Sequence, residues 1–468
     1  MTERSAEQIN LPLIAAIVGV ATIGGFMFGY DSGAINGTQE GLKSTFGLSE
    51  WTLGLTVSAL LPGCAVGAFV AGRLADSIGR RKVMMLSAIV FLVSAIASGA
   101  ADSALLLAIA RFFAGAAVGA ASVLSPAYIS EVTPASIRGR LSSVQQVMII
   151  AGLTGAFLAN YFLAQSAGSS LGEFWLGYPA WRWMFWLQAI PALLFLLTLL
   201  VIPESPRFLV AKGRLAEAEG VLTRLFGAGA AATKVQEIKA SLAGDHAPKL
   251  SDLNDPATGK WRKIVWVGIG LAVFQQLVGI NVVFYYGAVL WQAVGFSEAD
   301  ALKINILSGA LSIISCLCAI GLIDKIGRKP LLLIGSVGMA VTLGILTWCF
   351  SVGTFADGKL TLPEGVGTIA LYAANIYVIF FNFSWGPVMW VMLGEMFPNQ
   401  IRGSGLAVAG AAQWTANFAI SFSFPWLAVN IGLPITYGFY TICAFLSVIF
   451  VLKMVYETKG RELEDMTC

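Results

Sequence analysis

Charged residues and histidine are scarce in this 468-residue sequence. Asp, Glu, Lys and Arg make up 12% of it, whereas a soluble domain is about one-quarter charged. Hydrophobic residues make up 57%, and the mean hydropathy is +0.78. A chain this apolar cannot present a surface that water would wet, so we expect a lipid bilayer to cover most of it. The net charge of +3 says nothing by itself about nucleic-acid or acidic partners, and we expect no nucleic-acid partner.

The residues that enzymes and metal sites use are also few. The single histidine, His246, lies in a polar stretch without neighbouring ligand residues. The six cysteines follow no disulfide or zinc spacing, and the phosphate-binding pattern Gly-x-x-x-x-Gly-Lys-Ser/Thr is absent. The sequence therefore predicts neither an enzyme nor a metal or other cofactor. We also expect no cleavable signal peptide, because the polar start leads into an apolar run that is too long for one.

Long apolar runs account for most of the chain. A helix that spans a bilayer needs about 20 mostly apolar residues. Twelve such runs occur in two sets of six, and the polar region between the sets has helical composition near 213–225 and 232–242. The expected spans are 12–36, 52–75, 83–101, 104–129, 141–165 and 183–202, then 264–292, 303–323, 331–351, 367–393, 404–427 and 433–455.

The fold class that follows is an all-α membrane protein with twelve transmembrane helices in two pseudo-symmetric six-helix bundles. Residues 1–203 and 263–456 would form the bundles, joined by a cytoplasmic linker at 204–262 and followed by a cytoplasmic tail at 457–468. Most Lys and Arg residues fall in the loops and tails on the side of the two termini. Because cytoplasmic loops carry an excess of basic residues, we expect both termini to be cytoplasmic.

Three motifs of the first half recur in the second half in the same order. Recurrence at equivalent loops predicts two parallel repeats, related by an axis along the membrane normal. Asp76-Ser-Ile-Gly79-Arg80-Arg81 corresponds to Asp324-Lys-Ile-Gly327-Arg328-Lys329, Glu131-x-x-Pro134-x-x-x-Arg138-Gly139 to Glu395-x-x-Pro398-x-x-x-Arg402-Gly403, and Glu204-Ser205-Pro206-Arg207 loosely to Glu457-Thr458-Lys459-Gly460.

Further motifs extend this pattern along nearly the whole chain. They are Phe28-Gly29-Tyr30-Asp31, Gly72-Arg73-x-x-Asp76, Pro203-Glu204-Ser205-Pro206-Arg207, Gln275-Gln276-x-x-Gly279-Ile280-Asn281-x-x-x-Tyr285-Tyr286, Trp385-Gly386-Pro387 and Glu457-Thr458-Lys459-Gly460. In this order they resemble sugar porters of the major facilitator superfamily, which include bacterial proton-coupled xylose and glucose symporters and mammalian glucose facilitators. The resemblance implies alternating-access transport of a hexose or pentose, by a monomer in the bacterial inner (plasma) membrane. Tyr456 and Ser312 depart from the family pattern, which usually has Pro and often Asn at these positions.

A sugar site needs uncharged groups that donate and accept hydrogen bonds, together with aromatic faces for the C–H surfaces. Amides and aromatic residues of this kind lie in spans 5, 7, 10 and 11. They either bind sugar or hold the helices together by interhelical hydrogen bonds. The candidate substrate-binding residues are Phe28, Gln146, Gln275, Gln276, Asn281, Tyr285, Ser312, Gly386, Trp390, Gln413, Trp414 and Asn417.

Two of these amides could not meet on a regular helix. Gln276 and Asn281 would point about 140° apart, because each residue of an α-helix turns about 100°. We therefore expect the seventh span to bend or unwind near Gly279, where the freed backbone would face a cavity. Gly386 and Pro387 predict a similar break in the tenth span.

One acidic and one basic residue lie well inside the predicted spans. Asp31 and Arg111 would stand at matching depths in spans 1 and 4, and charges within the membrane are candidates for function. The pair is either a static packing contact or a proton-coupling site in which Asp31 alternates between protonated and ionised forms. The resemblance implies the second, because Asp at this position marks the proton-driven members.

Charges also gather at the predicted cytoplasmic ends of the spans. Either they are solvated loop residues, or they form a network that bridges the two bundles and controls cytoplasmic opening. We favour gating. For the protein as a whole we expect symport of a monosaccharide with a proton, and the alternatives are a passive sugar facilitator and a non-transporting sugar sensor. The candidate gating charges are Arg73, Asp76, Arg80, Arg81, Glu131, Arg138, Glu204, Asp324, Arg328, Glu395 and Arg402.

Overall fold

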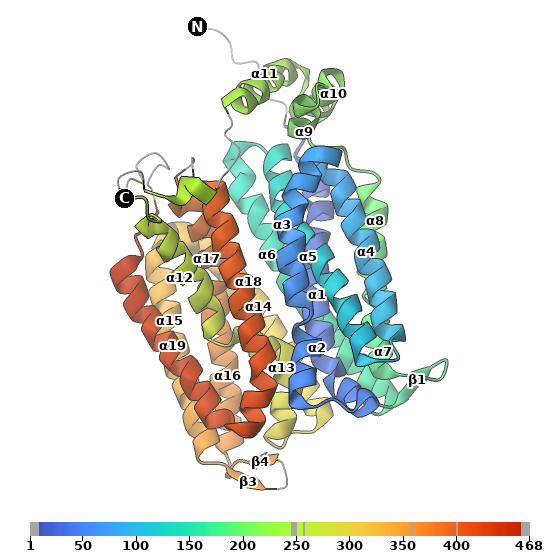
Figure 1. Cartoon of the computed structure of the whole chain (residues 1–468), viewed down its shortest axis with the longest axis vertical. Helices are drawn as coiled ribbons and strands as arrows, with labels where there is room; N and C mark the ends of the chain where they lie inside the picture. The colour runs from blue at the N-terminus through green and yellow to red at the C-terminus, as the bar shows by residue number, and fades with distance from the viewer. Residues whose placement is uncertain (1–8, 245–249, 256–257, 357–358, 399–400, 460–468) are drawn as a thin grey trace.

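The computed structural model describes residues 9–244, 250–255, 258–356, 359–398 and 401–459, and these residues are almost entirely α-helical (Figure 1). Within them, eleven helical segments are long and apolar enough to cross a membrane. The remaining predicted span, the eleventh at 404–427, corresponds to α18 (Arg402–Asn430), whose 29 residues are also long enough. Polar side chains such as Gln413 and Asn417 make α18 less apolar than the others.

The N-terminal half contains six spans, two of which are interrupted. The second is divided at Ala59 and the sixth at Leu187 and Gln188. The helices are α1 (Leu11–Phe46), α2 (Glu50–Ser58), α3 (Leu60–Ile78), α4 (Arg80–Ala100), α5 (Ala104–Val132), α6 (Ala135–Ala167), α7 (Ala180–Trp186) and α8 (Ala189–Leu199).

The C-terminal half repeats this plan, again with two interrupted spans. The seventh is divided at Val278 and Gly279 and the tenth at Ser384. Besides α18, the helices are α12 (Lys263–Leu277), α13 (Ile280–Ala293), α14 (Glu298–Ile326), α15 (Arg328–Ser351), α16 (Val366–Phe383), α17 (Trp385–Met396) and α19 (Leu433–Met454).

Short helices between the halves lie at one end of the bundles, here called the linker face (Figure 1). They are α9 (Pro206–Ala211), α10 (Leu215–Phe226), α11 (Ala228–Gly244) and the 3-10 helix η1 (Leu250–Leu253). The second and third confirm the two helices expected in the linker, whereas α9 was not expected. The backbone N–H of Asn10 donates to the carbonyl of Leu225 at 2.9 Å, which ties α10 to the start of α1.

Two small antiparallel hairpins lie at the opposite end, here called the hairpin face (Figure 1). One joins β1 (Glu173–Trp175) to β2 (Tyr178–Pro179), and the other joins β3 (Thr354–Ala356) to β4 (Lys359–Thr361). The sequence pattern indicates neither hairpin. Both connect spans, so they lie where the chain leaves one helix and enters the next.

Small polar side chains begin several of the helices. Asn10, Ser49, Ser103 and Ser297 precede α1, α2, α5 and α14, and each accepts a hydrogen bond from a backbone N–H of the first turn. The first N–H groups of a helix have no partner within the helix, and such side chains supply one.

Glycine allows the spans to approach closely. A Cβ at Gly29 of α1 would overlap the carbonyl oxygen of Ile149 in α6, and one at Gly152 would overlap the carbonyl of Phe26. Apolar lipid offers no hydrophobic drive for helix association, so membrane helices depend on such close packing.

We predict that Gly29→Ala destabilises the fold, because the added methyl group collides with backbone that cannot move aside. The free energy of unfolding should fall by about 1–3 kcal/mol. Gly19→Ala on the same helix is the control, since nothing lies within 4 Å of a Cβ at Gly19. Thermal unfolding of both variants, followed by circular dichroism, would contradict this packing if the two unfold alike.

Candidate functional site

The two intramembrane charges meet in the N-terminal half, as predicted. The Nη2 atom of Arg111 in α5 lies 3.3 Å from Oδ2 of Asp31 in α1, and Nη1 lies 3.4 Å from Oδ1. Both residues are 1% exposed. Nη2 also donates to the carbonyl of Val57 in α2 at 3.2 Å. This pair therefore joins three helices, and removing one partner would leave a buried charge unpaired.

Gln188 adds a polar group that the sequence analysis missed. It lies in the break between α7 and α8, beside the Asp31 carboxylate, and is 1% exposed. Within the described chain its Nε2 has no hydrogen-bond partner. The one signal for Gln188 in the sequence is that it is an isolated amide within the sixth apolar run.

The predicted break in the seventh span is confirmed at Gly279. This residue has φ +81°, a left-handed conformation in which other residues are strained. A Cβ there would also lie 2.7 Å from the ring of Tyr440. The freed carbonyl of Val278 accepts a hydrogen bond from the Tyr377 hydroxyl at 2.7 Å, so part of the interrupted backbone is satisfied by a neighbouring helix.

This break brings together the amides that a straight helix would separate. Nδ2 of Asn281 donates to Oε1 of Gln276, and Nε2 of Gln276 donates to Oε1 of Gln275 at 3.1 Å. Gln413 reaches the same Oε1 of Gln275 from α18 at 3.3 Å. Gln275 also donates to the carbonyl of Trp385 at 3.0 Å. Four predicted amides thus form one cluster from three helices, here called the amide cluster: Gln275, Gln276, Asn281 and Gln413.

Aromatic residues from both halves lie near this cluster. The rings of Phe28 in α1 and Trp414 in α18 meet edge to face, with centroids 5.8 Å apart. Tyr285 in α13 lies beside Ser32 and Asn417, and Ser32 directly follows Asp31. The predicted sugar residues and the charge pair are therefore linked through α1.

The remaining sugar candidates are less closely connected. Ser312 accepts a hydrogen bond from Asn382 at 3.1 Å, a contact that joins α14 to α16 and favours a helix-packing role. Gln146 is half-buried in α6, and Trp390 in α17 is 40% exposed. The break in the tenth span falls at Ser384, so Gly386 lies in the first turn of α17 rather than at the break as predicted. The missing N–H of Pro387 is tolerated there, because first-turn donors lack a partner within the helix.

Close to the hairpin face, α1 is bonded to the C-terminal half. Asn36 donates to the carbonyl of Phe284 at 2.8 Å, and its Oδ1 accepts from the N–H of Ala288 and from Asn305. Gln39 donates to the carbonyl of Tyr285. These contacts are not predictable from the sequence, because an amide in an apolar run does not indicate which helix it will face.

The N-terminal half has one charge cluster at the linker face. Arg80 pairs with Glu131 of α5 at 3.3 Å and with Asp76 at 2.8 Å. The carboxylate of Glu204 accepts the backbone N–H groups of Arg80 and Arg81 at 3.0 and 3.1 Å, which caps α4. Ser205 donates to Glu131.

The C-terminal half repeats this cluster almost residue for residue. Arg328 pairs with Glu395 at 2.8 Å and with Asp324 at 2.9 Å, and Thr458 donates to Glu395 at 2.6 Å. Glu457 accepts the backbone N–H groups of Arg328 and Lys329, each at 3.0 Å. Burial acts to raise the pKa of Glu457, but the backbone N–H groups of Lys459, Arg328, Lys329 and Thr458 together outweigh it and hold the pKa below its usual range. The helix-capping role of Glu457 was not predicted, although its motif was.

The ion pairs of these clusters each lie within one half of the described chain. The expected bridge between the bundles is therefore not formed in this conformation. Arg73 lies outside the clusters, with its guanidinium 5.1 Å from the ring centroid of Phe69. Arg402 donates to the carbonyl of Phe397 at 3.3 Å, while the side chain of Arg138 lies outside the described part of the chain.

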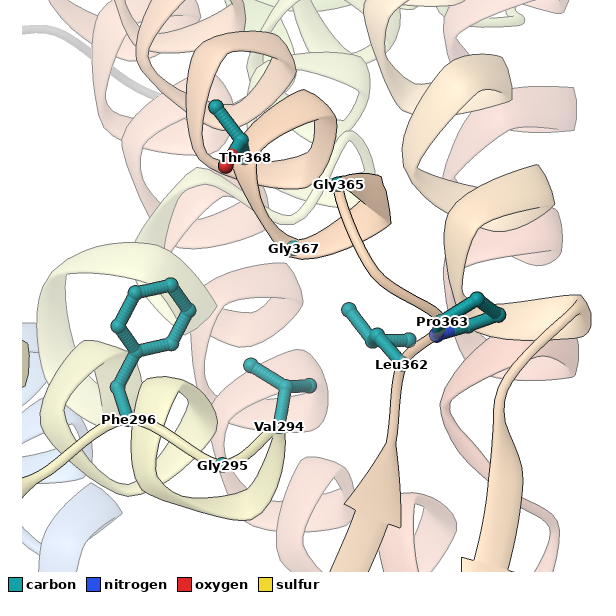
Figure 2. Close-up of a pocket in the computed structure, with 8 residues that line it drawn as sticks. All are labelled: Val294, Gly295, Phe296, Leu362, Pro363, Gly365, Gly367 and Thr368. Atoms are coloured by element: carbon teal, nitrogen blue, oxygen red, sulfur yellow. The ribbon is translucent and has the colours of Figure 1, made fainter.

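A small cavity of about 250 Å³ opens at the hairpin face of the C-terminal half. Figure 2 shows Phe296, Pro363 and Thr368 among the residues that line it. None of the predicted sugar residues lines this cavity, so it is separate from the amide cluster.

Comparison with known proteins places the chain among transporters. A family model described as "Sugar (and other) transporter" matches residues 17–468. The chain is 48% identical to a glucose transport protein of Synechocystis sp., over 99% of this chain and 98% of that protein. It is 38% identical to the D-xylose-proton symporter of Escherichia coli strain K12, over 98% and 96% of the two chains.

Solved structures of the xylose transporter of E. coli match the whole fold. A partially occluded inward-open conformation has a TM-score of 0.83 at 36% identity, covering 96% of this chain and 100% of that one. An inward-open conformation has a TM-score of 0.82 at 37% identity, covering 97% and 99%. A structure bound to 6-bromo-6-deoxy-D-glucose has a TM-score of 0.78 at 38% identity, covering 98% and 99%. The chain therefore belongs to the sugar transporter family of the major facilitator superfamily.

Proposed function

We propose that this protein transports a monosaccharide together with a proton across the membrane by alternating access. The observation that carries the proposal is the Asp31–Arg111 pair, because Asp31 lies on α1, the helix that also carries Phe28 of the proposed sugar site. The relatives named for glucose transport and for xylose–proton symport support the substrate class and the coupling.

Sugar binding is assigned to the amide cluster and the aromatic residues beside it. Uncharged amides can each donate to and accept from sugar hydroxyls, while Phe28 and Trp414 offer apolar faces to the C–H surface. In the absence of sugar the amides bond to one another, which satisfies several of their buried donors and acceptors, while Oε1 of Gln413 has no partner within the described chain. A sugar would replace these contacts with its own hydroxyls.

Coupling is assigned to protonation of Asp31. An ionised Asp31 holds Arg111 and thereby holds α1 against α5 and α2. A neutral Asp31 loses most of that attraction, so α1 is released to move relative to α5. Since α1 also carries Phe28 and Asn36, the proton changes the freedom of the helix that contacts the sugar site and the hairpin-face contacts.

The conformation of the structure is assigned as inward-facing. The bonds of Asn36 and Gln39 hold the two halves together near the hairpin face, whereas the ion pairs of the linker-face charge clusters each stay within one half of the described chain. The distribution of basic residues supports a cytoplasmic linker face, with both termini inside. In the opposite conformation, we propose that the two charge clusters meet and close the cytoplasmic side. We also propose that the protein acts as a monomer in the bacterial plasma membrane.

Uptake of labelled glucose and xylose into proteoliposomes tests this function directly. A symporter should accumulate its sugar above the outside concentration when the lumen is alkaline relative to the outside. It should only equilibrate the sugar when no proton gradient is present. Equal uptake under both conditions would instead support a passive facilitator, and binding without uptake would support a sensor.

We predict that Asp31→Asn abolishes accumulation against a gradient while preserving exchange of sugar across the membrane. The amide keeps the shape of Asp31 but cannot release a proton, so the cycle loses its coupling step. Asp300→Asn is the control, because Asp300 is an exposed acid at the start of α14. Counterflow and gradient-driven uptake should be measured on the same vesicles, and full accumulation by Asp31→Asn would end the proposal.

A second prediction concerns the cytoplasmic charges. Arg402→Gln should slow transport about tenfold, roughly 1.4 kcal/mol of barrier, while the sugar Kd changes little. The reason is that Nη2 of Arg402 is buried without a partner within the described chain, and is therefore available to the opposite bundle when the cytoplasmic side closes. Arg224→Gln on the exposed surface of α10 serves as the control. A parallel loss of sugar binding would show a folding or site defect rather than slower gating.

A further inference from the structure

The β1–β2 hairpin presents an unusually apolar surface. Phe174 is 41% exposed, Trp175 60%, Leu176 67% and Tyr178 45%. Glu173 is the one charged residue of its two strands and turn. A tip of this kind in water would be an exposed hydrophobic patch, and such patches mark contact surfaces.

The turn of this hairpin places an apolar residue in a strained backbone conformation. Leu176 and Gly177 form a two-residue turn with φ +56° and +76°. Such turns favour Asn or Gly at the first position, because a side chain with a bulky Cβ substituent is disfavoured at positive φ. Leu176 is the single non-glycine residue with positive φ in the described chain. Strain of this kind persists where the side chain has a use.

Stacked aromatic rings fix the hairpin to the bundle. Trp175 stacks on Trp183 of α7 with centroids 5.3 Å apart, and Nε1 of Trp183 donates to the carbonyl of Trp175 at 3.2 Å. Tyr178 meets Trp186 edge to face at 5.1 Å, and Nε1 of Trp186 donates to the carbonyl of Ile96 in α4 at 3.1 Å. These contacts hold the exposed tip of the hairpin in place against α7.

The hairpin continues the lipid-facing surface of the adjacent span. Ile190 of α8 is 63% exposed, and Leu193 and Leu194 are 47% and 52% exposed. Figure 1 shows β1 projecting sideways beyond α7 at the hairpin end of the bundle. Trp and Tyr are enriched where the hydrocarbon meets the headgroups, because their rings are apolar with one polar edge.

We propose that the β1–β2 hairpin inserts into the headgroup region of the outer leaflet and anchors the N-terminal bundle there. The partner that this surface contacts is the lipid bilayer, and the hairpin meets it on the same side as the lipid-facing surface of α8. Leu176 enters deepest, and the rings of Trp175 and Tyr178 lie at headgroup level. The second hairpin, β3–β4, has two threonines and Lys359 in its strands and is assigned no such role.

The anchor also bears on transport, because its support belongs to the contacts between the halves. Ala180 and Met184 of α7 pack in one apolar cluster with Ala288 and Leu302 of the C-terminal half. The N–H of Ser170, at the base of the hairpin, donates to Glu298 of α14 at 3.0 Å. Fixing the hairpin in the interface would therefore hold the N-terminal bundle in place while the C-terminal half moves against it.

Depth-dependent fluorescence quenching in proteoliposomes tests the anchor. Leu176→Cys is made together with Cys318→Ser and Cys468→Ser, labelled with an environment-sensitive nitrobenzoxadiazole fluorophore, and checked for sugar transport. The other cysteines, Cys64, Cys316, Cys349 and Cys443, are buried. We expect a nitroxide on the lipid headgroup to quench this label strongly, and a nitroxide deep in the acyl chain to quench it weakly.

The matched control carries the label at Glu364, an exposed residue of the loop that follows β4. This label should be quenched by aqueous iodide and not by lipid nitroxides. The proposal is overturned if position 176 behaves as position 364 does, or if the label at 176 is protected only by contact with a second copy, as shown by crosslinking between 176 positions.

Hydroxyl-radical footprinting of the unsubstituted chain in lipid nanodiscs provides an independent measurement. Trp175 and Tyr178 should be oxidised much less than their exposed fractions would allow in water. The exposed Pro363 in the loop after β4 should be oxidised at the rate expected of a proline in water. Rapid oxidation of the hairpin in nanodiscs would overturn the proposal even if the labelled variant failed to fold.

Discussion

An ionised side chain inside a bilayer has no water to solvate it, so its partner and its surroundings must be built around it. In this protein Asp31 and Arg111 are each other's charged partner. Arg111 also donates to the carbonyl of Val57 on a third helix. The same requirement brings α1, α2 and α5 together at one depth. Because α1 also carries Phe28 and Asn36, the charge pair determines where the presumed sugar site and the hairpin-face contacts can lie.

Interrupted helices are the second element on which the site depends. Gly279 ends one helix and begins another, so Gln276 and Asn281 reach each other across the break. An unbroken span would point these amides to different neighbours and leave at least one of them unsatisfied in hydrocarbon. The break at Leu187 and Gln188 similarly places an amide beside Asp31. Backbone irregularity and polar side chains therefore occur together, each making the other tolerable.

The two halves repeat their linker-face chemistry while differing in the membrane. Arg80, Glu131 and Glu204 have counterparts in Arg328, Glu395 and Glu457, down to the backbone N–H groups that each capping glutamate accepts. The amide cluster is built by the C-terminal half alone, and the Asp31–Arg111 pair by the N-terminal half alone. The C-terminal half thus carries the amides assigned to sugar binding and the N-terminal half the pair assigned to the proton, while α1 carries both Asp31 and the sugar-site residue Phe28.

The sequence by itself determined the membrane class, the twelve spans, the repeated loops and the break at Gly279, because each depends on local composition or on the fixed turn of a helix. It also identified Asp31 and Arg111, since charges within apolar runs are conspicuous. Only the tertiary structure decided what the buried amides face: Asn36 donates to the carbonyl of Phe284 and Gln188 lies beside Asp31, and no local pattern names these neighbours. The strained turn at Leu176 and the separation of the charge clusters are likewise decided by packing across the whole chain, where contacts between residues far apart in the sequence compete for the same space.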